Sequence, residues 1–158
     1  MTITPCIWFN HNAVEAAHFY ARTLPNSRVL TETAAPGDNP STKAGDPLMV
    51  EVDLDGLRLT LLNGGPMFPH TEAFSLQVPC ASQAEADHLY DALTADGGEP
   101  SQCGWLKDKF GMSWQVYPAQ MGEYLGGPDA EGAARAMAAM LEMQRIDLDA
   151  IRQAYIGA

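Results

Sequence analysis

The sequence predicts an α+β fold built from two βαβββ modules and a set of C-terminal helices. The segment VEAAHFY (14–20) is echoed seventy positions later by AEADHLY (84–90). Each copy follows a short apolar run and precedes a turn marked by glycine or proline, which indicates one unit made twice. We therefore expect one domain over residues 1–126, with modules at about 1–66 and 67–126, whose curved mixed sheet surrounds a central cleft. Residues 127–158 have the apolar spacing of helices, and we expect this extension to serve packing or a dimer interface.

The first module is expected to contain one helix and four strands. Asn12 is a good N-cap and Glu15 follows three residues later, so a helix should begin here and end at Pro25. Asp55-Gly56 stands between two alternating runs and predicts a hairpin with a type I′ turn. The expected strands cover residues 3–9, 27–34, 48–54 and 57–62, and a long loop covers residues 36–47.

The second module repeats this order. Ser82 caps a helix that Glu85 supports from the reciprocal position and that Gly97-Gly98 ends. The expected strands cover residues 73–78, 101–105 and 112–117. Beyond the module, helices are expected over residues 129–143 and after the cap Asp147. Their methionines are interpreted as packing residues, because Met fills irregular apolar gaps.

Composition limits the classes of partner. The 158 residues include 20 acidic and 9 basic side chains, for a formal net charge of -11, and the basic residues are scattered. A nucleic-acid partner is not expected, because phosphate binding requires clustered Lys and Arg. A membrane is not expected either, since no apolar run approaches the roughly 20 residues that span a bilayer. Three cysteines without CxxC spacing, and no apolar leader after a basic start, favour the cytoplasm.

Two long motifs carry a family resemblance. LNGGPMFPHTEAFSLQV (62–78) and CGWLKDKFGMSWQVYP (103–118) resemble the PhnB-like family of the glyoxalase, bleomycin-resistance and dioxygenase superfamily, also called vicinal oxygen chelate proteins. The opening CIWFNHNAVEAAHFY (6–20) and the tail AMLEMQRIDLDAI (139–151) look like the same family. Such proteins are often labelled 3-demethylubiquinone 3-methyltransferases. That activity is disfavoured here, because enzymes using S-adenosylmethionine usually need a glycine-rich turn and this chain has no GxGxxG.

The resemblance also implies a divalent metal held by four side chains. Aligned on the shared helix and strand ends, these positions fall on Pro5, Leu59, Ala73 (or Ser75, if the register slips) and Gln115. Pro and Leu cannot bind a metal through their side chains, and Gln is a weak ligand. We therefore expect no metal and no cofactor. A metal-dependent lyase or transferase of the glyoxalase type is the alternative.

The cleft face implied by this alignment is mostly apolar with a few neutral polar groups, which is the composition of a small-molecule pocket. Ser75 and Gln77 on this face are expected either to contact a ligand or to hydrogen-bond each other or a buried water. His70 and Glu72 are either an acid–base pair or two solvated loop residues, and no catalytic residue is assigned. The hypothesis is a homodimeric protein that binds a small molecule, with any reaction left open. The candidate ligand-binding residues are Phe9, Asn63, Ser75, Gln77, Trp105, Lys107, Gln115 and Tyr117.

Overall fold

The computed structural model describes residues 3–158. The chain divides into two compact units, Met1–His70 and Thr71–Ala158. Each unit is built around its own four-stranded sheet. The central cleft that was expected to lie between the two halves stays a prediction.

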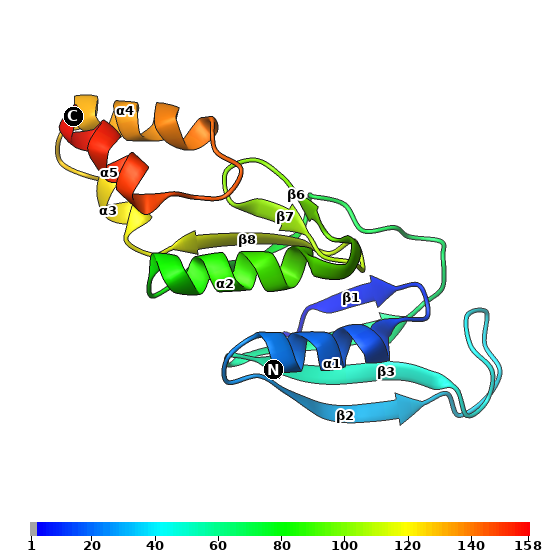
Figure 1. Ribbon diagram of the computed structural model, residues 1–158. Helices are drawn as coiled ribbons and strands as arrows, with labels where there is room; N and C mark the ends of the chain where they lie inside the picture. Colours follow the sequence, from blue (N-terminus) through cyan, green and yellow to red (C-terminus); the bar gives the residue numbers. More distant parts are fainter. Residues whose placement is uncertain (1–2) are drawn as a thin grey trace. The chain divides into compact units, whose positions relative to one another are not determined.

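The first unit has the expected βαβββ order (Figure 1). Its elements are β1 (Cys6–Phe9), α1 (Ala13–Thr23), β2 (Arg28–Ala34), β3 (Pro47–Leu54) and β4 (Leu57–Asn63). The sheet order is β1-β4-β3-β2, with β1 parallel to β4 and the other pairs antiparallel. Helix α1 covers one face of this sheet, where Val50, Val52 and Leu61 are all fully buried. Among residues 3–70 the first unit has no second helix, so the other face of its sheet carries no helix of this unit.

The second unit repeats the same topology. Its elements are β5 (Ser75–Cys80), α2 (Gln83–Thr94), the short 3₁₀ helix η1 (Ala95–Gly97), β6 (Glu99–Pro100), β7 (Trp105–Lys107) and β8 (Ser113–Pro118). The sheet order is β5-β8-β7-β6, with β5 parallel to β8, which matches the first sheet strand for strand. Helix α2 lies along one face (Figure 1), where Leu106, Trp114 and Val116 are buried. The predicted α+β class and internal duplication are confirmed.

Local signals account for several boundaries. Asp55 and Gly56 both have positive φ, 49° and 90°, as the predicted type I′ turn requires. The Ser82 side chain accepts a hydrogen bond from the Glu85 amide at 3.2 Å, and the Glu85 carboxylate accepts one from the backbone amide of Ala81 at 2.6 Å. The predicted reciprocal capping of α2 is therefore present, with its second bond one residue earlier than in the standard motif.

The predicted strand over residues 101–105 is wrong. Cys103 and Gly104 have positive φ, 56° and 82°, so the extended chain is interrupted there and β7 begins only at Trp105. The backbone amides of Cys103 and Gly104 both donate at 2.7 Å, to the carbonyls of Met143 and Gln144. The segment before the last helix thus takes the hydrogen bonds that the expected strand would have made to a neighbour.

The C-terminal extension packs on its own unit. It contains α3 (Met121–Leu125), α4 (Ala130–Leu141) and α5 (Leu148–Ile156), gathered around the buried side chains of Ala136, Ile146 and Ile151 (Figure 1). The Gln83 side chain on α2 ties this extension down, since it donates to the Ile146 carbonyl at 2.8 Å and accepts from the Leu148 amide at 2.9 Å. A homodimer through these helices stays a prediction. None of the helices described in residues 3–158 combines the length and the apolar character that crossing a bilayer requires.

Candidate functional site

The face of the second sheet opposite α2 carries most of the predicted site residues. Neighbouring strand residues that pair in the ladder project from the same face of a sheet. Leu76, Trp114 and Leu106 form one such row and lie toward α2. The two flanking rows, which project from the opposite face, are Ser75–Ser113–Lys107 and Gln77–Gln115–Trp105.

Polar side chains on this open face form a short hydrogen-bonded chain. Gln115 Nε2 donates to Ser75 Oγ at 2.9 Å, and Gln77 Nε2 lies 3.5 Å from Gln115 Oε1. Ser75 and Gln77 were expected either to contact a ligand or to hydrogen-bond each other or a buried water. In the structure, Gln115 lies between them and contacts both. Gln77 is exposed, so its amide is available to solvent and to a bound molecule.

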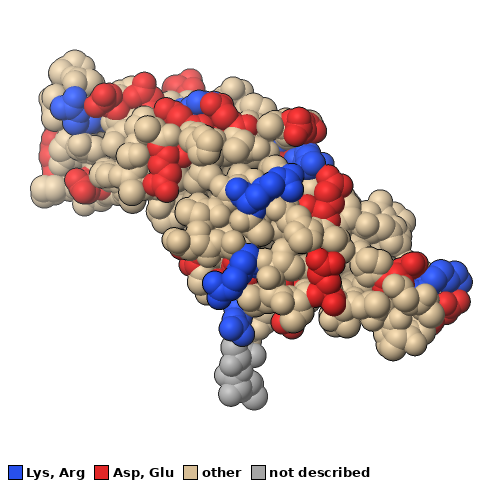
Figure 2. Space-filling model, turned by 60° about the horizontal axis from the view of Figure 1, so that its bottom comes forward, with Lys and Arg blue, Asp and Glu red and all other residues tan. Residues whose placement is uncertain are grey.

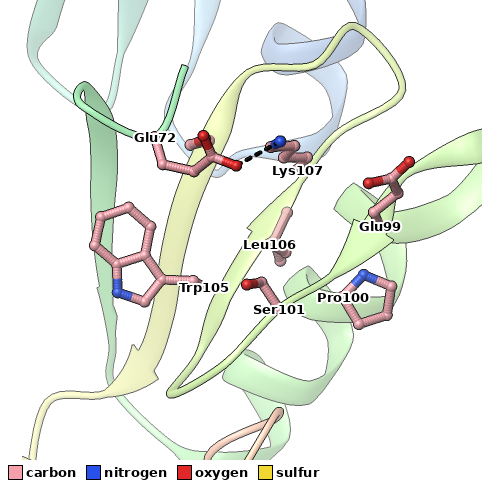
Figure 3. Close-up of a pocket in the computed structure, with 8 residues that line it drawn as sticks. Glu72, Glu99, Pro100, Ser101, Trp105, Leu106 and Lys107 are labelled. Carbon is pink, nitrogen blue, oxygen red and sulfur yellow. Dashed lines mark ion pairs between the residues drawn. The ribbon is translucent and has the colours of Figure 1, made fainter. Parts of the chain in front are cut away.

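A hollow of about 120 Å³ lies at the β6–β7 side of the same face (Figure 3). Lys107 and Glu72 both line it and form an ion pair, with Lys107 Nζ 2.5 Å from Glu72 Oε1. The Trp105 indole lies beside this pair. Ser113 is only 1% exposed, and its hydroxyl has no hydrogen-bond partner among the described residues. The lining residues are Glu72, Glu99, Pro100, Ser101, Trp105, Leu106, Lys107 and Ser113.

The ion pair in this hollow shifts the pKa of both of its members. The hydrogen bond with Glu72 is the main cause that raises the pKa of Lys107, and the carboxylates of Glu72 and Glu99 add to it. The hydrogen bond from Lys107 in turn lowers the pKa of Glu72. Lys107 is therefore a cation and Glu72 an anion at neutral pH, so the hollow offers a fixed ammonium that is already paired with a carboxylate.

Two predicted residues of the first unit lie on the wrong face. Phe9 is 1% exposed and Asn63 is 4% exposed, and both are on the side of the sheet that α1 covers. Asn63 Oδ1 accepts a hydrogen bond from the Ala13 amide at 2.9 Å, so this side chain satisfies the first turn of α1. Asn12, the predicted N-cap, makes no side-chain capping bond. Asn63 was expected on the open face, and Asn12 was expected to cap α1. Both predictions are wrong, because the Asn63 side chain, fifty positions from Ala13, takes the capping role.

Tyr117 is on the correct face but is covered. Its ring packs against the core of the C-terminal helices rather than toward the hollow. The predicted residues that the structure brings together on the open face are therefore Ser75, Gln77, Trp105, Lys107 and Gln115. Of the eight residues that line the hollow, Trp105 and Lys107 were predicted ligand contacts and the other six were not. Glu72, Glu99 and Ser101 lie outside the central strands, and only tertiary structure brings them to this face.

The open face of the first sheet is lined by the alternate residues of its strands. Trp8 pairs with Leu62 in the ladder, and Thr60 pairs with Glu51. A second hollow of about 100 Å³ lies here beside Glu51, Arg58 and Thr60. None of the candidate ligand-binding residues lines it, although Leu59, one of the implied metal positions, does. The expected face was shifted by one position, and one position exchanges the faces of a strand.

The metal that the superfamily resemblance implied does not fit the residues present. Leu59 is 1% exposed, and its side chain is a hydrocarbon that offers no atom to bind a metal. Gln115 already hydrogen-bonds Ser75. Within either unit, no group of three or more His, Cys, Asp or Glu side chains among residues 3–158 is placed to hold a metal ion. No chemical step is therefore derived through a metal.

His70 and Glu72 each have a partner in their own unit. The His70 ring donates from Nε2 to the Trp8 carbonyl, which accepts only, and its edge meets the Phe9 ring with centroids 4.9 Å apart. Glu72 pairs with Lys107. His70 Nδ1 is buried and has no hydrogen-bond partner among residues 3–158. The contacts that His70 and Glu72 do make are with other residues, so they do not form the acid–base pair that was one of the two alternatives.

Charge on the surface is mixed. On the face drawn in Figure 2, Lys and Arg side chains lie in small groups among Asp and Glu side chains. On this face the cations are therefore not gathered into one patch. A bound anion would consequently be held by one local cation rather than by a broad positive field.

A family model matches most of the chain. The family model described as 3-demethylubiquinone-9 3-methyltransferase matches residues 1–117. The match covers both βαβββ modules and stops before α3, so the C-terminal helices lie beyond it. No curated protein matches the sequence.

Solved structures share the fold. The PhnB protein from Bacillus cereus is 27% identical, with a TM-score of 0.66, and the alignment covers 75% of this chain and 100% of that one. Protein PA1353 from Pseudomonas aeruginosa is 25% identical, with a TM-score of 0.54, over 72% of this chain and 94% of that one. The fosfomycin resistance protein FosX from Listeria monocytogenes, complexed with Mn(II) and sulfate, is 11% identical. Its TM-score is 0.52 over 80% of this chain and 95% of that one, which shows a shared fold alone.

Proposed function

Because the chain belongs to the 3-demethylubiquinone-9 3-methyltransferase family, a PhnB-like group of the vicinal oxygen chelate superfamily, we propose that it is a small-molecule-binding protein whose ligand lies on the open face of the second sheet. The binding side chains are Ser75, Gln77, Trp105, Lys107 and Gln115. No metal from the superfamily site is required, and no reaction is assigned.

One observation carries this proposal. One β-sheet face, opposite α2, carries two amides and a hydroxyl on its strands. The Trp105 indole and the Lys107 ammonium on the same face line a hollow of about 120 Å³. Convergent polar groups beside an aromatic wall are the usual makeup of a ligand pocket. The buried hydroxyl of Ser113 has no hydrogen-bond partner among residues 3–158, and a bound polar group would supply one.

The two other activities have less support in this chain. Metal-dependent chemistry of the glyoxalase type needs ligands that positions such as Leu59 do not supply. Methyl transfer, which the family description names, needs a site for the methyl donor. The turns that join each first strand to its helix, residues 10–12 and 81–82, contain no glycine to admit a nucleotide closely.

A ligand-observed NMR screen of a fragment library tests the proposal. We expect fragments with an aromatic ring and a polar group to show saturation transfer from the wild-type protein. Replacing both amides, in the double variant Gln77→Leu and Gln115→Leu, should abolish the transfer. The control is Thr60→Val, which removes a polar group from the open face of the first sheet. Fragments that bind the double variant and the wild-type protein equally would contradict the proposal.

A further inference from the structure

We propose that the hollow beside Lys107 binds the carboxylate of a small aromatic acid, and that the Glu72 side chain occupies the position of that carboxylate in the unliganded protein. This inference rests on the proposed function and names the class of ligand. Two independent observations support it, namely the geometry of the Glu72–Lys107 pair and the partnerless hydroxyl of Ser113.

The ion pair is built so that a ligand can replace one side of it. Lys107 belongs to β7, and its side chain is 34% exposed. Glu72 is 62% exposed and lies in a turn just before β5, within the segment 64–74 that contains no helix or strand. Exposed ion pairs contribute little to stability, because solvent screens them. A ligand carboxylate can therefore take the place of Glu72 without breaking a strand.

Ser113 supplies the second contact. It pairs with Lys107 in the antiparallel ladder and lines the same hollow. Its residue is 1% exposed, and its Oγ has no hydrogen-bond partner among residues 3–158. A buried hydroxyl normally has a partner, since an unsatisfied one costs free energy. A carboxylate has two oxygens, so one can accept from Lys107 Nζ while the other accepts from Ser113 Oγ.

The size and walls of the hollow define the remainder of the ligand. A volume of about 120 Å³ is smaller than the roughly 300–1,000 Å³ of pockets that enclose a whole ligand, so it suits one carboxylate and part of a ring. The Trp105 indole forms a wall beside the ion pair, which favours an aromatic ring there. Glu99 also lines the hollow and opposes an anion, so affinity should be modest.

The test uses three planar probes of one shape, namely benzoate, neutral benzamide and cationic benzamidinium. Each is titrated into ¹⁵N-labelled full-length protein, and chemical shifts are followed at the Trp105 indole and at the amides of Lys107 and Ser113. Benzoate should cause the largest shifts. The variant Glu72→Gln removes the competing carboxylate, and it should bind benzoate more tightly by up to about five-fold, the range of a screened ion pair.

Further variants separate charge from structure. Lys107→Met should weaken benzoate binding more than ten-fold, whereas Lys107→Arg should retain it because the cation remains. Ser113→Ala should weaken binding by about two- to ten-fold, the effect of one hydrogen bond. The matched controls are Glu123→Gln and Lys109→Met, which make the same charge changes outside the hollow and should leave affinity within about two-fold.

Two results would overturn the inference. One is benzoate affinity that does not rise in Glu72→Gln, and the other is affinity that survives in Lys107→Met. If benzoate fails while neutral fragments still shift the side-chain amides of Gln77 and Gln115, the ligand class is wrong and the proposed function stands. If no compound shifts any group on this face, both are wrong.

Discussion

Asp108 holds together the hairpin that carries Lys107, and its replacement is a sharp test of how the site is built. The residue is 2% exposed. Its Oδ1 accepts hydrogen bonds from the amides of Phe110 at 2.8 Å and Met112 at 3.0 Å. Its Oδ2 accepts from Trp114 Nε1 at 2.8 Å. One buried carboxylate thus accepts hydrogen bonds from two amides in the turn between β7 and β8 and from one side chain on β8.

In the variant Asp108→Asn, an NH₂ group replaces one of the two carboxylate oxygens. Both oxygens accept hydrogen bonds in the wild-type protein, so the NH₂ group faces an N–H donor in either orientation of the amide. We expect the free energy of unfolding to fall by about 2–3 kcal/mol, because a charge-assisted bond is lost and a donor is left unpaired. Asp108→Ala leaves all three donors unpaired and should cost about 3–5 kcal/mol, which is a large part of the total stability of a small domain. The free-energy costs of the three lost bonds do not simply add, because water can reach part of the turn once the carboxylate is removed.

Urea denaturation followed by tryptophan fluorescence measures both variants. The slope of the transition should stay unchanged while its midpoint falls. The matched control is Asp55→Asn in the corresponding turn of the first unit, where φ is 49° and an asparagine is equally suited. This control should stay within about 0.5 kcal/mol of wild type. An Asp108→Asn variant that is as stable as the control would refute the reasoning.

Two further predictions concern the glycine that follows β4 and the cysteines. Gly64→Ala would place a methyl group 2.2 Å from the Trp8 ring, so unfolding experiments should show a loss of about 1–3 kcal/mol, while Gly37→Ala, with no heavy atom within 4 Å, should be neutral. A stable Gly64→Ala protein would show that Trp8 is not fixed there. Burial, assisted by a nearby carboxylate, raises the pKa of Cys80 from 9.0 to about 11, so its thiolate fraction near pH 8 falls about 100-fold. Iodoacetamide followed by mass spectrometry should therefore label exposed Cys6 first and Cys80 only after denaturation, and equal rates for the two thiols would contradict this.

The fold could be predicted because its signals are local. A Ser–Glu capping pair and an Asp-Gly turn require only neighbouring residues, and both form where the sequence places them. The echo between VEAAHFY and AEADHLY correctly indicated a duplicated βαβββ topology. The strand expected over residues 101–105 does not form, because the amides of its own Cys103 and Gly104 donate to a segment forty residues later.

The open face of the sheet could be predicted only in the second unit, and the reason is patterning. Around Ser75–Val78 and Ser113–Val116, polar and apolar residues alternate, so the faces are distinct and Ser75, Gln77 and Gln115 were placed correctly. In CIWF and LTLLN, apolar residues occupy both faces, so the sequence cannot decide between them. Phe9 and Asn63 were therefore assigned to the open face although they lie under α1.

The most direct measurement of the central claim is a residue-resolved NMR titration of chelator-treated protein with a fragment from the screen. The open face of the second sheet should bind that fragment with its own side chains. The account predicts shifts at the Trp105 indole and the side-chain amides of Gln77 and Gln115 before any metal is added. Shifts that avoid this face, or that appear only after manganese, zinc or nickel is supplied, would contradict it.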